Sequence, residues 1–395
     1  MTEGLPLSGL RVVEFSHMVM GPSCGLILAD LGADVIKIEP APNGDKTRRL
    51  PGSGAGFFVS FNRNKRSLAL DLKTPEGIAI VKRLIAHADI VTENFRPGGL
   101  DAMGLGYEAL AQAHPRLIYC SMKGFLSGPY EDRAALDEVV QMMGGLAYMT
   151  GPPGRPLRAG SSVNDIMGGM FAVIAILAAL QERHRSGRGQ YVKSALFESN
   201  MFLVAQHMMQ FAVTGKAAAP MPARISAWGV YDVFDTEDAS QIFVGIVSDT
   251  QWHAFCDAFA QPDLKIDPEL ATNSLRVAAR DRLIPRLRVL FASMTRADIA
   301  ALCEATRLPY APIMRPEDMF DDPHLNAPGA MIEIGLGDGR HAPVPALPIE
   351  MDGARLGLRH DVPTPGKDSA AILHEIGMAQ DEIDALAARG IVRLS

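Results

Sequence analysis

A carboxylate stands at the start of a long apolar segment near the middle of the chain. Asp165 precedes residues 166–180, which contain no charged side chain, and residues 181–189 then bring basic residues and two glycines. The pattern predicts a helix that is buried on most of its sides and ends at a glycine. Asp165 would cap this helix, with its carboxylate facing free backbone N–H groups at the positive end of the helix dipole.

Two interpretations of Asp165 are open. An aspartate at a helix start is commonly a structural cap. It can also be a nucleophile, because a carboxylate with the reference pKa of ~3.9 is ionised at neutral pH. Gly168 and Gly169 follow within one turn, and a glycine inside a helix costs ~1 kcal/mol against alanine. Close approach by a ligand or by another backbone would explain both glycines.

A second group of residues could bind a phosphorylated ligand. Asn94, Phe95 and Arg96 follow a predicted strand, and ligands of open α/β sheets bind beyond the carboxyl ends of the strands. The amide of Asn94 can hydrogen-bond an adenine or a pantetheine amide, and Phe95 or Met103 can pack on a ring. Arg96 suits a phosphate. Coenzyme A fits such a site, and ATP fits the spacing almost as well.

Further charged residues allow two interpretations each. The basic run at residues 62–66, which Lys73 extends, is either a solvated surface or a second source of phosphate contacts. His17 is either a catalytic base or a structural histidine. Asp137 starts another apolar helix, and it is either a cap or a second carboxylate near Asp165.

Strands and helices alternate over the first half of the chain, which predicts an α/β fold with a mostly parallel sheet and helices on both faces. The predicted strands are residues 11–15, 35–39, 67–72, 89–93, 117–121 and 190–194. Glu39 ends the second strand, where the ribose-binding acid of a dinucleotide site would stand. However, the first turn at residues 17–25 lacks the pattern G-x-G-x-x-G, so a nicotinamide dehydrogenase is disfavoured.

The length of 395 residues predicts two domains. We expect the first part of a large domain at residues 1–213 and a linker at residues 214–224. A small α+β domain with two strands and three helices is expected at residues 225–325. Residues 326–395 would return to the large domain and complete it.

The composition is that of an ordinary soluble globular protein, with 48% hydrophobic and 21% charged residues. A net charge of −7 argues against nucleic acid or an anionic membrane as the main partner. The four cysteines are far apart in the sequence, which predicts free thiols, no metal site and a reducing compartment. The N-terminus lacks a basic segment followed by an apolar one, so we expect no signal peptide and a cytoplasmic protein.

Several motifs together resemble the family III CoA-transferases. They are residues 7–15, 21–24, 30–39, 62–67, 94–98 and 103–106, together with the stretch around Asp165. The resemblance covers nearly the whole chain and is densest over residues 7–200. It implies a Rossmann-like large domain built from both termini, a small central domain, and a homodimer whose two chains interlock like links.

The resemblance also implies site residues. It makes Asp165 the nucleophile and coenzyme A or acyl-CoA a substrate, with no cofactor bound permanently. The residues at the CoA-contact positions of the family are Val19, Met20, Pro40, Leu70, Asp71, Leu72, Lys73, Asn94, Phe95, Arg96, Ala102, Met103, Ala134 and Asp137. Pro40 and Ala102 stand where some relatives carry an arginine, so phosphate contacts would move to Arg96 or to the basic run.

The expected activity is transfer of CoA from an acyl-CoA, such as succinyl-CoA, to a carboxylic acid. A dicarboxylate acceptor is expected by analogy and because Arg48 and Arg49 are spare cations. Oxalate is disfavoured because the glycine-rich loop of formyl-CoA:oxalate transferases is not evident. Gly168, Gly169 and N–H groups at the helix start would stabilise oxyanions.

Two alternatives remain open beside CoA transfer. A 2-methylacyl-CoA racemase or another acyl-CoA isomerase needs a base on each face of the α-carbon. Leu136 stands where such racemases carry a histidine, which argues against racemisation. The other alternative is a protein that binds CoA or a nucleotide without catalysis.

Overall fold

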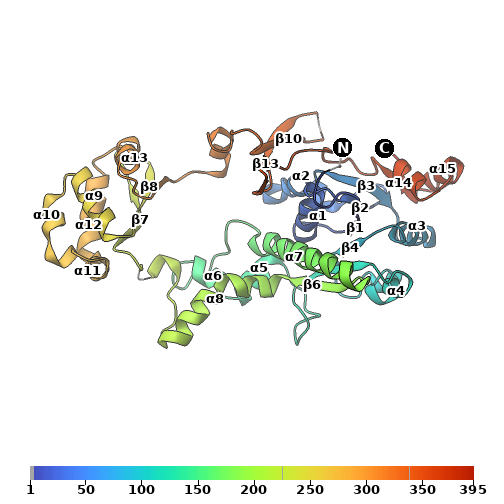
Figure 1. Ribbon diagram of the computed structural model, residues 1–395, viewed down its shortest axis with the longest axis horizontal. Coiled ribbons are helices and arrows are strands. Elements are labelled where there is room, and N and C mark those ends of the chain that lie inside the picture. The colour runs from blue at the N-terminus through green and yellow to red at the C-terminus, as the bar shows by residue number, and fades with distance from the viewer. Residues whose placement is uncertain (1–3, 225, 338) are drawn as a thin grey trace. The chain divides into compact units, whose positions relative to one another are not determined.

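The computed structural model describes residues 4–224, 226–337 and 339–395. The chain divides into two compact units, one formed by Met1–Pro222 with Pro323–Ser395 and the other by Ala223–Asp322 (Figure 1). The unit of Ala223–Asp322 is inserted in sequence between the two segments of the other, large unit. All of the predicted site residues belong to the large unit, which both ends of the chain build together.

A seven-stranded sheet forms the centre of the large unit, with the strand order β14-β3-β2-β1-β4-β5-β6. Its strands are β1 (Arg11–Phe15), β2 (Asp34–Pro40), β3 (Lys65–Leu70), β4 (Ile90–Glu93), β5 (Ile118–Lys123), β6 (Tyr191–Ala195) and β14 (Val392–Arg393). β1 to β6 pair in parallel, and β14 pairs antiparallel with β3. The predicted α/β fold with a mostly parallel sheet is therefore confirmed.

Helices cover both faces of this sheet. They are α1 (Met20–Asp30), α2 (Phe57–Phe61), α3 (Pro75–Ile85), α4 (Tyr107–Ala113), α5 (Asp137–Met143), α6 (Leu146–Thr150), α7 (Val163–Ser186), α8 (Leu196–Thr214), α14 (Ser369–Glu375) and α15 (Gln380–Ala388). Successive strand residues point to opposite faces. Val13 and Phe15 of β1 thus pack in one core with α3, α14 and α15, and Val12 packs in another with α1 and α7.

The C-terminal segment is attached to the sheet by hydrogen bonds as well as by apolar contacts. The backbone N–H of Ser67 in β3 donates to Asp368 Oδ2 at 2.9 Å. Val392 and Arg393 of β14 pair with Leu70 and Ala69 of β3. The return of the chain therefore covers the β3 side of the sheet.

The long helix α7 ends as predicted, at Gly187 in the left-handed conformation with φ of 71°. The expectation that it is buried on most sides is wrong, because Met170, Ile174 and Leu177 leave an apolar stripe exposed. Among the described residues, α7 is long and apolar enough to cross a membrane by length and composition alone. It packs against α1 and against the sheet, and the core helix of a soluble protein passes the same test.

The inserted unit has more elements than predicted. Its antiparallel sheet contains β7 (Val230–Asp235), β8 (Gln241–Ile246) and β9 (Tyr310–Pro312). Its α-helices are α9 (Asp249–Ala258), α10 (Pro262–Ile266), α11 (Asn273–Ala278), α12 (Arg280–Phe291) and α13 (Arg296–Ala305). The additional helices α10 and α11 span five and six residues, too few for a helical period to show in the sequence.

Two glycines allow α7 to approach α1 closely. A Cβ on Gly169 would lie 2.2 Å from Ser23 Oγ and 2.8 Å from the backbone oxygen of Met20. A Cβ on Gly168 would lie 2.4 Å from Met20 Cε. The backbone approach that could explain these glycines is therefore the one between two helices.

Gly169→Ala is expected to destabilise the large unit by about 1–3 kcal/mol, although alanine is the better helix former. The reason is that the new methyl group cannot avoid the backbone of α1. Chemical denaturation monitored by circular dichroism would measure the change. Gly128→Ala is the control, since nothing lies within 4 Å of its Cβ position. Equal stability of the two variants would contradict the close packing.

Candidate active site

The predicted ligand-binding segments meet at one edge of the sheet. Residues 19–20 follow β1, Pro40 ends β2, residues 70–73 follow or end β3, and residues 94–96 follow β4. Because these four strands are neighbours in the order β3-β2-β1-β4, their carboxyl ends place the segments side by side. Ala134 and Asp137, by contrast, follow β5.

Several of these residues have no side chain free for a ligand. Val19, Met20 and Leu70 are buried, with exposed fractions of 1%, 3% and 0%. A ligand could therefore reach them only through their backbone. Lys73 and Arg96 are exposed at the same edge and offer cations there.

Hydrogen bonds hold the loop after β1 in a strained conformation. Met18 has a positive φ of 64°, which is uncommon for a residue with a side chain. Its N–H donates to Thr47 Oγ1 at 3.0 Å. The Asn94 side chain accepts the N–H of His17 at 3.0 Å and donates to its carbonyl at 2.9 Å. Asn94, which was predicted to bind the ligand, thus fixes the loop in this structure.

His17 is placed by the same loop. Its ring stacks on Phe95 with 5.7 Å between ring centroids. Desolvation lowers the pKa of His17 and outweighs the negative charge of Asp45, which acts in the opposite direction. The lowered pKa favours the neutral imidazole. The stacked ring is consistent with a structural histidine.

A buried network of charges lies beneath this loop. Lys37 Nζ donates to the backbone oxygen of Ser16 at 2.6 Å and pairs with Asp45 Oδ2 at 3.1 Å. Asp45 in turn accepts the hydroxyl of Thr47, the residue that holds Met18. Lys37 and Glu14 have fully buried side chains. Such a network fixes geometry more than it adds stability, since desolvation offsets most of the attraction.

Arg63 and Lys65 of the basic run at residues 62–66 are structural, so both predicted interpretations are wrong for these two cations. Arg63 is 1% exposed and pairs with Asp30 at 2.6 Å. Lys65 is also 1% exposed and pairs with Glu14 at 3.0 Å. Each cation is neutralised by a carboxylate that the fold brings to it, so these two cations cannot serve phosphates. Arg66, at the end of the run, bonds Asp34 and Glu375.

Arg48 is not a spare cation either. It donates to both oxygens of Glu39, at 2.6 and 2.8 Å, and its guanidinium lies 3.6 Å from the ring centroid of Phe58. Glu39 also accepts the Ser67 hydroxyl at 2.7 Å. This set of bonds leaves Glu39 no role as a ribose ligand. Arg49 is exposed and donates to the backbone oxygen of Asn43.

Asp165 is the third residue of α7 and does not cap it, contrary to the prediction. The N-cap is Ser162, which makes no side-chain capping bond. Asp137 supplies the cap from another helix, because its Oδ1 accepts the N–H of Asn164 at 2.8 Å and that of Asp165 at 3.3 Å. Gln141 holds Asp137 in place by donating to its Oδ2 at 2.6 Å. The structure thus brings the two carboxylates together.

This environment makes Asp165 a weak acid. Its pKa is raised to about 7, mainly by burial and also by the negative charge of Asp137, while the positive charge of Arg158 lowers it. The prediction of an ordinary ionised aspartate is therefore corrected. A strongly shifted carboxyl beside a specific charged partner is a candidate for catalysis.

Gly168 and Gly169 have a packing role in this site. They lie inside α7, where their N–H groups belong to the hydrogen bonds of the helix itself. The prediction that these N–H groups stabilise oxyanions is therefore not supported. Their contact with Met20 places the loop after β1 against the helix that carries Asp165.

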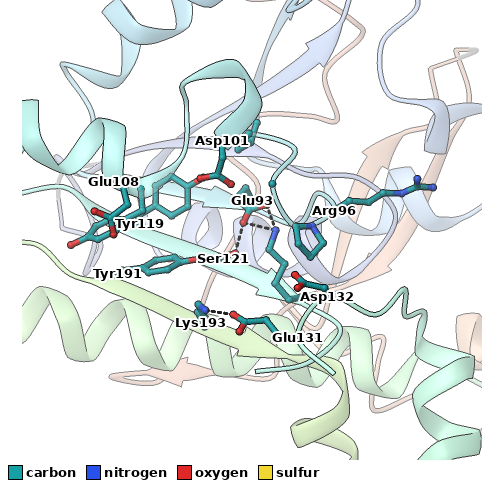
Figure 2. Close-up of a pocket in the computed structure, with 15 residues that line it drawn as sticks. Glu93, Arg96, Asp101, Glu108, Tyr119, Ser121, Glu131, Asp132, Tyr191 and Lys193 are labelled. Carbon is teal, nitrogen blue, oxygen red and sulfur yellow. Dashed lines mark hydrogen bonds and ion pairs between the residues drawn. The ribbon is translucent and has the colours of Figure 1, made fainter. Parts of the chain in front are cut away.

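A cavity of about 200 Å³ opens beside Arg96, Lys123 and Lys193, and the sequence did not reveal it (Figure 2). Three stacked or edge-on tyrosines line it, namely Tyr107, Tyr119 and Tyr191. Figure 2 shows Arg96 directed away from these rings. The lining has more carboxylates than cations, and Lys123 and Lys193 are paired with two of the carboxylates. The cavity is therefore a poor place for phosphates.

No group of metal-binding side chains is found within residues 4–224, 226–337 and 339–395. The residues that sequence reasoning missed are Thr47, Gln141 and Arg158. None of them belongs to a sequence motif that indicates a site. Each contacts a site residue only in the folded chain: Thr47 contacts Met18, and Gln141 and Arg158 contact Asp137.

Comparisons with known proteins agree on one family. The sequence profile described as CoA-transferase family III matches residues 7–369. A succinate–glutarate CoA-transferase of Agrobacterium fabrum is 37% identical over 385 residues, which cover 94% of this chain and 96% of that protein. A succinyl-CoA:glutarate CoA-transferase of Mus musculus is 32% identical and covers 98% of this chain and 90% of that protein.

A solved structure is also similar over most of the chain. The crystal structure of a CAIB/BAIF family protein from Brucella suis matches with a TM-score of 0.84 and 37% sequence identity. The match covers 94% of this chain and 99% of that one.

Asp165→Asn is expected to raise the stability of the fold by up to about 4 kcal/mol at pH 8. The folded-state pKa of about 7 lies above that of an unfolded aspartate, so the ionised form is destabilising in the native state. The penalty is complete above pH 7 and fades as the pH falls toward 4. Thermal unfolding at pH 8 and pH 5 would show the gap between variant and wild type narrowing at the lower pH. A gap that widens there would contradict the shifted pKa.

Proposed function

The chain belongs to CoA-transferase family III, and we propose that it moves CoA from succinyl-CoA to a second dicarboxylic acid through Asp165. The observation that carries this proposal is the position of Asp165. It lies at the entrance of α7, its pKa is about 7, and its helix packs on the loop at the carboxyl edge of the sheet. A carboxylate in that place can attack an acyl group held at the edge.

The chemistry follows from the carboxylate. An oxygen of Asp165 attacks the thioester carbonyl, the C–S bond breaks, and a mixed anhydride and CoA thiolate result. The thiolate attacks the carbonyl of Asp165, the donor acid leaves as a carboxylate, and an aspartyl–CoA thioester remains. The acceptor carboxylate attacks this thioester and releases the thiolate, which then takes the acyl group of the second anhydride. No proton is consumed, and the activated acyl bond is kept throughout.

CoA would lie along the edge formed by β3, β2, β1 and β4. The backbone of Val19, Met20 and Leu70 would contact it, and the exposed cations Lys73 and Arg96 would meet its phosphates. No cofactor would be bound permanently. The buried charges beneath the loop after β1 would keep that loop rigid while the acyl group is transferred.

The choice of a dicarboxylate rests on the relatives, which are named for succinate, glutarate and succinyl-CoA. Racemisation is less well supported. Leu136 is 67% exposed beside Asp137, and a leucine offers no proton-transferring group there.

We also propose a homodimer, on the evidence of the apolar surface of α5, α7 and α8. Its most exposed members include Leu136 at 67%, Phe202 at 70% and Val213 at 79%. Apolar surface of this kind marks an interaction site. A reducing compartment such as the cytoplasm is proposed because the four cysteines are buried and free.

Asp165→Asn is expected to lower CoA exchange between succinyl-CoA and glutarate by at least ~10³-fold, because an amide cannot form the anhydride. Mass spectrometry of the wild-type protein with succinyl-CoA should find CoA attached at Asp165, and hydroxylamine should remove it. Asp281→Asn in α12 is the control for the substitution itself. Undiminished exchange, or an adduct on another residue, would reject the nucleophile.

The rate with succinyl-CoA should rise with pH through about 7, since only the ionised form of Asp165 attacks. The quantity to measure is kcat/KM for succinyl-CoA between pH 5.5 and 9. In Asp137→Asn the midpoint should move to lower pH, because the neighbouring negative charge is gone. A midpoint that stays in place would show that Asp137 does not act on Asp165.

A further inference from the structure

Arg158 lies beside the pair of carboxylates at the entrance of α7. It belongs to the loop between α6 and α7, and its Nη2 is 3.6 Å from Asp137 Oδ2. The other oxygen of Asp137 accepts the N–H of Asp165 at 3.3 Å. The guanidinium is thus separated from the nucleophile by a single side chain.

Most N–H donors of the Arg158 guanidinium have no hydrogen-bond acceptor among the described residues. Its Nε donates to the backbone oxygen of Ala159 at 3.1 Å. Its Nη1 is 3.7 Å from Glu138 Oε2, and both ion pairs exceed the length of a hydrogen bond. Over the described ranges of the chain, no hydrogen bond from either Nη atom is found, and the side chain is 38% exposed. A planar fork of N–H groups is therefore open to an incoming carboxylate.

A dicarboxylic substrate needs such a cation. Asp137 already places negative charge beside Asp165, and a substrate with a second carboxylate adds more. The arginines favoured from the sequence do not meet the need as well. Arg48 is bonded to Glu39, and Arg49 donates to the backbone oxygen of Asn43 in the segment after β2.

We propose that Arg158 binds the distal carboxylate of the dicarboxylic substrate and so determines the preference for dicarboxylates over monocarboxylates. The proposal rests on the proposed CoA-transferase activity through Asp165. The same guanidinium would hold the free carboxylate of the succinyl group in the donor step and that of the acceptor acid in the return step. Both acids form their anhydride with the same side chain, Asp165, so one cation can bind the distal carboxylate of each.

The test compares two acceptors of equal chain length, glutarate and pentanoate, with succinyl-CoA at a fixed saturating concentration. In Arg158→Gln, kcat/KM for glutarate should fall on the order of 10²-fold, and kcat/KM for pentanoate should change less than about 3-fold. Arg158→Lys should lose less, about 10-fold, because a cation remains without the planar fork. Measurement at pH 8.5 keeps Asp165 ionised in every variant.

Arg155→Gln is the matched control, since Arg155 is an exposed arginine in the same loop. It should leave both values unchanged. Equal losses for glutarate and pentanoate in Arg158→Gln would overturn the inference, because a merely structural role would not discriminate between the acids. If Arg158→Gln fails to fold by circular dichroism, the selectivity ratio of Arg158→Lys decides.

Failure of the underlying function gives a different result. A wild-type protein that exchanges CoA with neither acid would reject the proposed transferase activity. A wild-type protein that exchanges CoA but prefers pentanoate would keep the transferase activity and reject the role of Arg158.

Discussion

The carboxylates of Asp137 and Asp165 both lie at the N-terminus of α7. The site depends on which of them accepts the free N–H groups of the helix. Asp137 accepts the first N–H groups of α7, so the favourable hydrogen bonds at the positive end of the helix go to a residue of α5. Asp165 is buried next to the negative charge of Asp137 and does not accept these N–H groups. Its pKa therefore rises to about 7. A carboxyl group in this condition gains from forming a neutral acyl bond, which relieves both desolvation and repulsion.

The loop after β1 is the other half of the site, and buried ions keep it in place. Lys37 of β2 and Thr47 bond the loop, and Asp45 holds both of these residues in place. Asn94 bonds the loop from the end of β4. These bonds hold Met18 in a conformation that an isolated chain would rarely adopt. Buried ion pairs add little net stability, so their value here is a fixed loop geometry.

The contact between α1 and α7 joins the two halves. Because Gly168 and Gly169 lack side chains, the two helix starts come close enough for Met20 to lie on the first turns of α7. Asp165 and the loop after β1 are thereby fixed relative to each other through the packing of α1 on α7. Beyond this contact, α7 and α8 leave apolar side chains exposed, among them Met170, Ile174 and Phe202.

The sequence by itself determined the six parallel strands of the large unit, the end of α7 at Gly187 and the candidate Asp165. Periodicity, capping residues and glycines act over a few residues, so these features can be seen locally. Only the tertiary structure decided that Asp137 caps α7, that Arg63 and Lys65 are buried, and that Arg158 lies beside the carboxylates of Asp137 and Asp165. Whether a cation is buried in an ion pair or exposed depends on a partner far away in the sequence. Asp30 is that partner for Arg63, and Glu14 is that partner for Lys65. Local residue spacing carries no information about such partners.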